Sequence, residues 1–178
     1  MTIEKRAAHE ARAEGKKLVG YAAVFDQETR IADFNEVVRR GAFSASLAAA
    51  DDKLALVDHD SGKVLARTKS GTLRLEEDER GLRFEIDMPE TTLGRDLLAM
   101  AARGDLGGAS FAFTVPAGGD VWSGDRRELR SVSLHEVSIV QSFPAYSGTS
   151  VQARSRQSRT DADRRIALLE MEAVNVAL

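Results

Sequence analysis

The polar residue types that act together in acyl transfer stand in separate segments of this 178-residue chain. Ser110 follows a pair of glycines, and His59 stands between two aspartates. A serine hydroxyl becomes a nucleophile when a histidine takes its proton, and a third polar group orients that histidine. The third group could be Glu136 or its neighbour His135. The linear spacing leaves open whether these side chains meet in the folded protein.

The stretch GDLGGASFAF places Ser110 between small residues and an apolar run. If Phe111 and Phe113 face the core, strand alternation puts Ser110 on the opposite, small and polar face. Gly107 and Gly108 allow another backbone to come close, or supply N–H groups that can donate to a developing oxyanion. The alternative is structural: the serine is the small residue of a tight turn between a helix and a strand.

His59 ends the apolar run LALV and lies between Asp58 and Asp60. A histidine at the end of a strand can reach across a sheet, and a carboxylate at Nδ1 would fix its tautomer for work as a base. Two alternatives remain open, a solvent-exposed turn histidine and a metal site. Adjacent carboxylates point in different directions, which argues against the metal, so we predict neither a metal nor another cofactor.

The segment SVSLHEVSIV, residues 131–140, alternates polar and apolar residues up to His135. Continued alternation puts Glu136 on the apolar face, where a carboxylate is costly unless it is paired. The apolar residues after Glu136 would then fall on the other face, so either both faces are covered or a β-bulge resets the register. The partner of the carboxylate is either His59 or an arginine, and an arginine would make it a structural ion pair.

The elements that must position these residues are mostly strands. Residues 73–88 alternate apolar and polar side chains on either side of an acidic turn that contains glycine, which predicts a hairpin with one buried face. An apolar stripe between Thr91 and Gly104 predicts a helix with a threonine cap and a C-terminal glycine. Together with the runs that hold His59, Ser110 and Glu136, this pattern predicts a compact, mostly β (α+β) domain with a few peripheral helices.

The two ends of the chain differ from its middle. Residues 1–16 are charged and rich in alanine, and we expect a lead-in, at most a frayed helix, in which His9 is solvated. Residues 17–153 contain the predicted strands and form the domain. Residues 154–178 begin with the polar linker RSRQSRT, and a T-x-x-D box then predicts a C-terminal amphipathic helix.

Composition excludes several classes of function. The chain has no cysteine, which removes disulfides, thiolate metal sites and cysteine nucleophiles. Its formal charge of −3 is mixed in sign along the sequence, which argues against nucleic acid as a partner. No apolar run approaches the ~20 residues that span a bilayer, and the N-terminus lacks the apolar core of a signal peptide. We therefore expect a soluble, intracellular protein without a membrane partner.

Six short motifs occur in a fixed order that resembles the prohead proteases of tailed bacteriophages, the HK97-type family. The resemblance covers about residues 17–153. The motifs are GYAAVFD (20–26), RRGAF (39–43), DHD (58–60), GLRFE (81–85), GDLGGASFAF (104–113) and LHEVSIVQSFPA (134–145). The resemblance implies a serine endopeptidase with a β-barrel-like core related to that of the herpesvirus assembly proteases.

The resemblance also assigns roles to individual residues. It implies that His59 is the histidine of the DHD turn, Ser110 the serine after the glycine pair, and Glu136 the acidic member of the LHEVS strand. The herpesvirus enzymes use a second histidine as the third member, which makes His135 the second choice. One departure from the family pattern is Ala112, which stands where the family often has glycine.

The biological setting follows from the same resemblance. It implies cleavage of the major capsid protein or a scaffold protein, and of the enzyme itself, inside the assembling prohead in the host bacterial cytoplasm. We expect a homo-oligomer without a nucleic-acid partner, and residues 154–178 as a partner-binding or self-cleaved tail. Two alternatives remain: a catalytically inactive, capsid-associated scaffolding module on the same fold, and a hydrolase of small esters.

Overall fold

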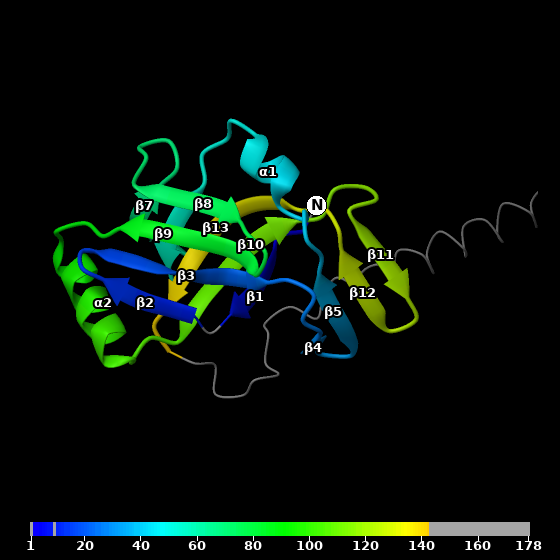
Figure 1. Ribbon diagram of the computed structural model, residues 1–178, viewed down its shortest axis with the longest axis horizontal. Coiled ribbons are helices and arrows are strands. Elements are labelled where there is room, and N and C mark those ends of the chain that lie inside the picture. Colours follow the sequence, from blue (N-terminus) through cyan, green and yellow to red (C-terminus); the bar gives the residue numbers. More distant parts are fainter. Residues whose placement is uncertain (1, 9, 143–178) are drawn as a thin grey trace, which may run out of the picture.

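The computed structural model describes residues 2–8 and 10–142, and the predicted C-terminal helix and His9 lie outside them. The described residues form thirteen strands and two helices, so the predicted mostly β class is confirmed (Figure 1). The described strands lie in three sheets, and none of these closes into a barrel. The barrel-like core and the likeness to herpesvirus proteases therefore stay predictions.

The largest sheet has five strands in the order β1-β10-β13-β6-β7. Its strands are β1 (Glu4–Ala8), β10 (Gly108–Thr114), β13 (Ser133–Val140), β6 (Leu54–Val57) and β7 (Asp60–Arg67). Neighbouring strands are antiparallel except β13 and β6, which run parallel. Every predicted site residue lies in one of these strands, in the turn between β6 and β7, or directly before β10.

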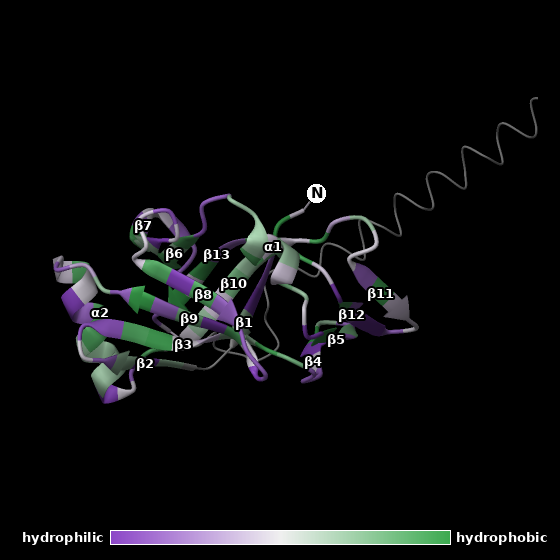
Figure 2. Cartoon of the chain, turned by 45° about the horizontal axis from the view of Figure 1, so that its top comes forward, coloured by the Kyte–Doolittle hydropathy of each residue, from purple (hydrophilic) through white to green (hydrophobic). Residues whose placement is uncertain are grey.

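A second sheet packs across the first and covers its apolar face. Its order is β2-β3-β9-β8, and it crosses over β10 and β13 in Figure 1. The strands are β2 (Glu10–Glu14), β3 (Lys17–Val24), β9 (Gly81–Asp87) and β8 (Leu73–Glu77). Along β8 and β9, hydrophobic and hydrophilic residues alternate in Figure 2, as the predicted hairpin requires.

The third sheet lies at the opposite end of the molecule from α2 (Thr92–Arg103) in Figure 1. Its order is β11-β12-β5-β4, and β12 and β5 are parallel. The strands are β11 (Asp120–Ser123), β12 (Arg126–Leu129), β5 (Phe34–Val38) and β4 (Thr29–Ile31). A short helix, α1 (Ser44–Ala48), packs against β13 and β8.

Helix α2 begins and ends as the sequence predicts. The Oγ1 of Thr91 accepts a hydrogen bond from the Gly94 backbone N–H at 3.1 Å, and Gly104 ends the helix in the left-handed conformation. The threonine satisfies one of the unpaired N–H groups of the first turn, and glycine adopts a positive φ without a Cβ clash. The helix buries Leu97 and Ala101 on its inner face, which fixes the chain that leads into β10.

Aromatic residues form the centre of the core between the five-stranded sheet and the β2-β3-β9-β8 sheet. Phe111 and Phe113 stack in β10 with ring centroids 5.0 Å apart, and Phe43 meets Phe111 edge-on at 5.3 Å. Phe84 of β9 is fully buried beside them in the same apolar cluster. Because these rings hold one face of β10 in the core, the other face of β10 must carry Ser110.

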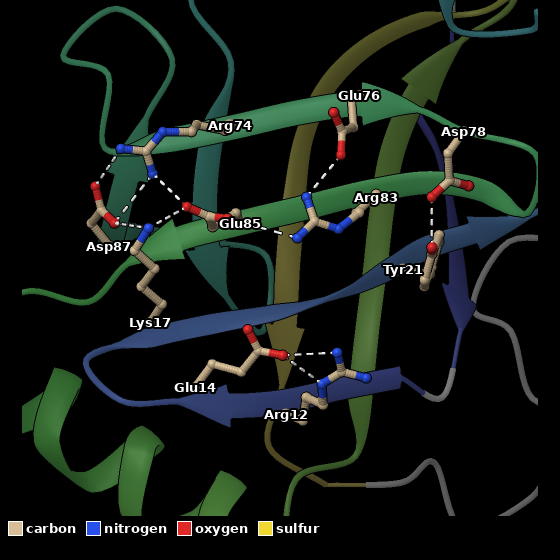
Figure 3. Close-up of polar contacts among 10 residues, drawn as sticks. All are labelled: Arg12, Glu14, Lys17, Tyr21, Arg74, Glu76, Asp78, Arg83, Glu85 and Asp87. Atoms are coloured by element: carbon tan, nitrogen blue, oxygen red, sulfur yellow. Dashed lines mark hydrogen bonds and ion pairs between the residues drawn. The ribbon is translucent and has the colours of Figure 1, made fainter.

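The outer face of the β2-β3-β9-β8 sheet is covered by ion pairs (Figure 3). Arg74 of β8 bonds to Glu85 at 2.8 Å and to Asp87 at 2.9 Å, both in β9. Arg12 and Glu14 make a similar pair within β2. Solvent-exposed ion pairs contribute little to the free energy of unfolding. The main effect of these charged side chains is that this face of the sheet is polar and faces solvent.

The expected N-terminal lead-in is corrected by the structure, because it contains the strands β1 and β2 instead of a frayed helix. In β2 the small residues Ala11 and Ala13 pack against the core and alternate with exposed charged residues. In β1 the side chains of Glu4 and Arg6 are buried. A run of charges suggested solvation, but partners distant in sequence make burial possible here.

Close backbone contact at Gly81 gives a stability prediction. A Cβ added there would lie 2.0 Å from the carbonyl oxygen of Ala23 in the neighbouring strand. We expect Gly81→Ala to lower the free energy of unfolding by about 3 kcal/mol, because backbone must move to relieve the clash. Urea unfolding measures this loss. The matched control is Gly62→Ala, where the new methyl meets only the end of the Asp60 side chain, at 3.2 Å. Similar midpoints for the two variants would contradict the prediction.

Candidate active site

The structure brings His59, Ser110 and Glu136 into one chain of contacts. Nε2 of His59 lies 2.8 Å from Oγ of Ser110, and Nδ1 of His59 is hydrogen-bonded to Oε1 of Glu136. Ser110 comes from β10, Glu136 from the neighbouring strand β13, and His59 from the turn between β6 and β7. Segments up to 77 residues apart in sequence thus meet on one face of the five-stranded sheet.

The position of Ser110 follows from the pairing of β10 with β13. Ser110 pairs with Ser138, and Ala112 pairs with Glu136, so these four residues share the face opposite the core. Ser110 is only 3% exposed. The hydroxyl therefore lies in a small, enclosed polar environment beside the carboxylate-bearing strand.

The two glycines before Ser110 differ in their backbone roles. The N–H of Gly107 donates to the carbonyl oxygen of Val140 at 2.8 Å, so it is engaged in strand pairing and is not available to an oxyanion. This bond argues against the oxyanion role predicted for Gly107. Gly108 has φ +111°, which side chains rarely permit, so the chain enters β10 through a conformation that favours glycine.

A β-bulge in β13 separates Glu136 from the apolar face. Ala112 pairs with Glu136, but the next residue of β10, Phe113, pairs with Leu134. His135 is therefore the extra residue of the bulge. The bulge corrects the simple alternation, which put Glu136 on the same face as Leu134, and it is one of the two solutions that the sequence left open.

His135 does not join the cluster. Its side chain is exposed, and its Nε2 lies 3.1 Å from Oγ1 of Thr114. The carboxylate of Glu136 occupies the position beside Nδ1 of His59 instead. Of the two predicted third members, only Glu136 contacts His59.

The turn that carries His59 has an unusual backbone. Asp58 and His59 have φ values of +50° and +58°, and both are left-handed. Two such residues between antiparallel strands match a type I′ hairpin turn, whose twist suits the strands but which costs energy for residues other than glycine. Surrounding contacts must therefore hold the turn in this conformation.

Two residues at the end of β13 supply those contacts. The Oγ of Ser138 accepts a hydrogen bond from the His59 backbone N–H at 2.7 Å. The carboxylate of Asp58 accepts from the backbone N–H and side-chain amide of Gln141 at 3.0 and 2.7 Å. Sequence reasoning missed Ser138 and Gln141, and it considered Asp58 only as a neighbour of the histidine or as part of a metal site. The available signal was the position of Ser138, which lies two residues after Glu136 and hence on the same face.

Burial strengthens the interactions of the cluster. Glu136 is 9% exposed, and its second oxygen, Oε2, is buried without a hydrogen-bond partner among the described residues. In the part of the chain that the structure describes, the Glu136 carboxylate therefore forms a hydrogen bond only with His59. An anion at Nδ1 favours the tautomer in which Nδ1 holds a proton and Nε2 faces the serine. The described residues contain no His, Asp and Glu cluster suited to a metal ion.

A buried ion network joins β1, which pairs with β10, to the third sheet. Arg6 bonds to Glu36 of β5 at 2.6 Å and to Glu4 at 2.8 Å. Arg127 of β12 bonds to Glu4 at 2.6 Å, to Glu36 at 3.1 Å and to Asp120 of β11 at 2.9 Å. Burial acts to raise the pKa of the Glu4 carboxyl, but the hydrogen bonds and charges of Arg127 and Arg6 outweigh it and lower the pKa.

This network predicts a loss of stability in acid. The pKa of Glu4 is lower in the folded protein than its ordinary value of 4.5, so the unfolded chain binds the proton more readily. The stability that the carboxylate contributes is complete above pH 4.5 and is lost as the pH falls through the folded-state pKa. We expect the urea midpoint to decrease below that pH, and to decrease less steeply in Glu4→Gln. Equal slopes in the two proteins would contradict this role for Glu4.

A mostly β domain in which serine, histidine and glutamate contact one another in this order fits the class of serine peptidases. The Caudovirus prohead serine protease family matches residues 2–163 of the chain. Because the match covers nearly all of the sequence, the chain belongs to this family and is a serine peptidase. No curated protein and no solved structure matches it.

Family membership also gives the setting in which the protein acts. A prohead protease acts within the assembling phage capsid during capsid maturation, and its substrate class is capsid protein. The match begins ahead of β1, so both N-terminal strands lie within the family region. No helix among the described residues is long and apolar enough to cross a membrane.

Proposed function

We propose that this chain is the endopeptidase that trims the major capsid protein or a scaffold protein, and also itself, inside the maturing prohead. Ser110 is the nucleophile, His59 the general base and acid, and Glu136 the group that orients His59. The observation that carries this proposal is the 2.8 Å contact between His59 Nε2 and Ser110 Oγ, combined with the hydrogen bond from His59 Nδ1 to Glu136.

The reaction would proceed by acyl transfer. His59 Nε2 takes the proton of Ser110 as Oγ attacks the scissile carbonyl carbon. His59 then gives this proton to the leaving amine, the C–N bond breaks, and an ester joins the substrate to Ser110. Water attacks the ester and passes a proton to His59, which returns one to Ser110. Glu136 stabilises the imidazolium that forms in both halves of the reaction.

A donor to the oxyanion is the remaining requirement. The N–H of Gly107 is engaged with Val140, so Gly108 is the remaining one of the two glycines for this role. Its φ of +111° shows that the backbone departs from an ordinary strand conformation close to Ser110. We propose Gly108 as the glycine that contributes to the oxyanion site.

We further propose a herpesvirus-protease-like arrangement of the core and assembly of the chain as a homo-oligomer. The site of action is the prohead in the host cytoplasm. The protease domain would extend to residue 153, and residues 154–178 would form a partner-binding or self-cleaved tail.

A fluorophosphonate probe tests the nucleophile directly. The probe phosphonylates a serine that a histidine activates, with loss of fluoride, and peptide mass mapping then locates the adduct. We expect a single adduct on the peptide that contains Ser110, and none after the protein is denatured. A well-folded, assembled sample without an adduct would favour the inactive scaffolding module. Rapid turnover of small esters without cleavage of co-expressed capsid protein would favour a small-ester hydrolase.

The orienting role of Glu136 predicts a graded loss. Glu136→Gln keeps the shape but removes the negative charge beside Nδ1 of His59, so the imidazolium is no longer stabilised. We expect the rate of probe labelling to fall by about 10²–10⁴-fold at neutral pH. A purely structural glutamate would change the unfolding midpoint but not the labelling rate of the folded protein.

A further inference from the structure

We propose that β1 occupies the place of an extended peptide substrate on β10, and that it must leave before Ser110 can react. This inference rests on the proposed function, because it assumes that Ser110 is the nucleophile. The inference adds two points: the substrate binds as an extra strand on β10, and β1 keeps the site inactive while it occupies that position.

The position of β1 is the first observation. β1 is an edge strand, and its partner in the sheet is β10, whose other edge pairs with β13. Ala7 pairs with Ser110 and Arg6 with Phe111, so β1 runs directly beside the serine. Extended peptides commonly bind proteins by adding a strand to a sheet edge. The edge of β10 beside Ser110 is the one that β1 covers.

The burial of Ser110 points in the same direction. A nucleophile must approach a carbonyl carbon to about 3 Å before it reacts, yet the serine is only 3% exposed. A peptide from another molecule cannot reach Oγ while its surroundings remain as they are. Departure of β1 would expose both the hydroxyl and a row of backbone hydrogen-bonding groups on β10.

The hydroxyl proton of Ser110 gives the most specific argument. Oγ lies 2.6 Å from the carbonyl oxygen of Arg6, and it also lies 2.8 Å from Nε2 of His59. A hydroxyl has one proton, and a carbonyl oxygen can only accept, so that proton is donated to Arg6. The same proton then cannot also be donated to Nε2 of His59. β1 therefore withholds the serine proton from the group that must take it.

The interactions that hold β1 on β10 are of a kind that allows β1 to dissociate. Its sequence, EKRAA, has no large apolar side chain, so β1 itself buries little apolar side-chain area. It brings one negative and one positive charge, Glu4 and Arg6, into the buried network, and both leave together. Glu36 and Arg127 remain paired with each other at 3.1 Å. No unpaired charge is left behind, which would be the most costly result of breaking such a network.

The same network indicates which peptides fit in place of β1. An antiparallel strand on β10 would direct alternate side chains toward Arg127 and Glu36, as Glu4 and Arg6 now do. An acidic residue followed two positions later by a basic residue satisfies both groups. The next residue, beside Ser110, is alanine in β1. We infer that substrates carry an acidic residue, any residue, a basic residue and then a small residue.

The chain has no cysteine, so an engineered pair can lock β1 in place. Lys5 and Ala112 are paired across β1 and β10, and the full-length Lys5→Cys/Ala112→Cys variant can form a disulfide between the strands. We expect the oxidised form to react with a fluorophosphonate probe at least tenfold more slowly than the reduced form. The matched control is Arg74→Cys/Glu85→Cys, which joins β8 to β9. Its labelling rate should be the same in both redox states.

The outcomes separate this inference from the proposed function. Equal labelling of the oxidised and reduced forms, with the disulfide verified by mass, would overturn the inference and leave the nucleophile assignment intact. Absence of labelling in the wild type would overturn the proposed function, and the inference with it. A second variant, Glu4→Gln/Arg6→Gln, weakens the attachment of β1 without a crosslink. It should label several-fold faster than the wild type, and an unchanged or slower rate would overturn the inference.

Discussion

Cleavage of a co-expressed cognate capsid protein is expected to stop when Ser110 is replaced by alanine. The hydroxyl of Ser110 lies within hydrogen-bond distance of His59 Nε2, so in the proposed mechanism its removal leaves no nucleophile for the scissile carbonyl. Loss of a serine nucleophile typically lowers kcat by about 10⁴–10⁶-fold, and the remaining rate comes from binding and oxyanion stabilisation. Intact mass measurement of the capsid protein and of the enzyme would detect both substrate cleavage and self-cleavage.

The matched control for this experiment is Ser46→Ala. Ser46 is also a buried serine, and its Oγ accepts a hydrogen bond from the Leu134 backbone N–H at 2.9 Å, on the core side of β13. Its loss should cost stability of about 1 kcal/mol without removing cleavage. Trimmed capsid protein in the Ser110→Ala sample would show that another residue is the nucleophile.

The second large effect is expected for His59→Ala. Without the imidazole, the Ser110 hydroxyl must lose its proton to water, so labelling by a fluorophosphonate should slow by about 10⁴–10⁶-fold. The measurement is the labelling rate at neutral pH, with circular dichroism to verify that the protein is folded. In the proposed mechanism His59 and Ser110 act as a unit, so combining both substitutions should cost little more than either alone.

His135→Ala is the control that decides between the two histidines. His135 is exposed and bonds to Thr114, so its removal should change the labelling rate less than about twofold. Comparable losses in the two histidine variants would give His135 a catalytic role and contradict the assignment of Glu136 as the third member.

Local sequence patterns predicted the elements whose structure depends on local interactions. The helix from Thr92 to Arg103 and the hairpin of β8 and β9 follow from side-chain periodicity, capping and turn residues, which act within a few positions of the chain. The sequence also predicted which face of β10 lies in the core, because Phe111 and Phe113 alternate with small residues. These predictions needed no knowledge of distant partners.

The misjudged elements depend on partners distant in sequence. Glu4 and Arg6 resembled solvated charges, but Glu36 and Arg127 pair with them in the interior. Alternation within β13 left a bulge as one of two possibilities, and only the register with β10 decides between them. Sheet pairing and ion pairing over long sequence separations are tertiary properties, so a local pattern gives no direct signal of them.

The candidate site also combines features that the sequence predicts with features that depend on tertiary contacts. The sequence by itself determined which residue types were available: a serine after two glycines, a histidine at a strand end and a carboxylate in an apolar strand. Only the tertiary structure decided that His59 contacts both Ser110 and Glu136, that His135 lies apart, and that the Arg6 carbonyl competes for the serine proton. The physical reason is that residue type sets what a group can do, whereas strand pairing sets which groups are close enough to do it.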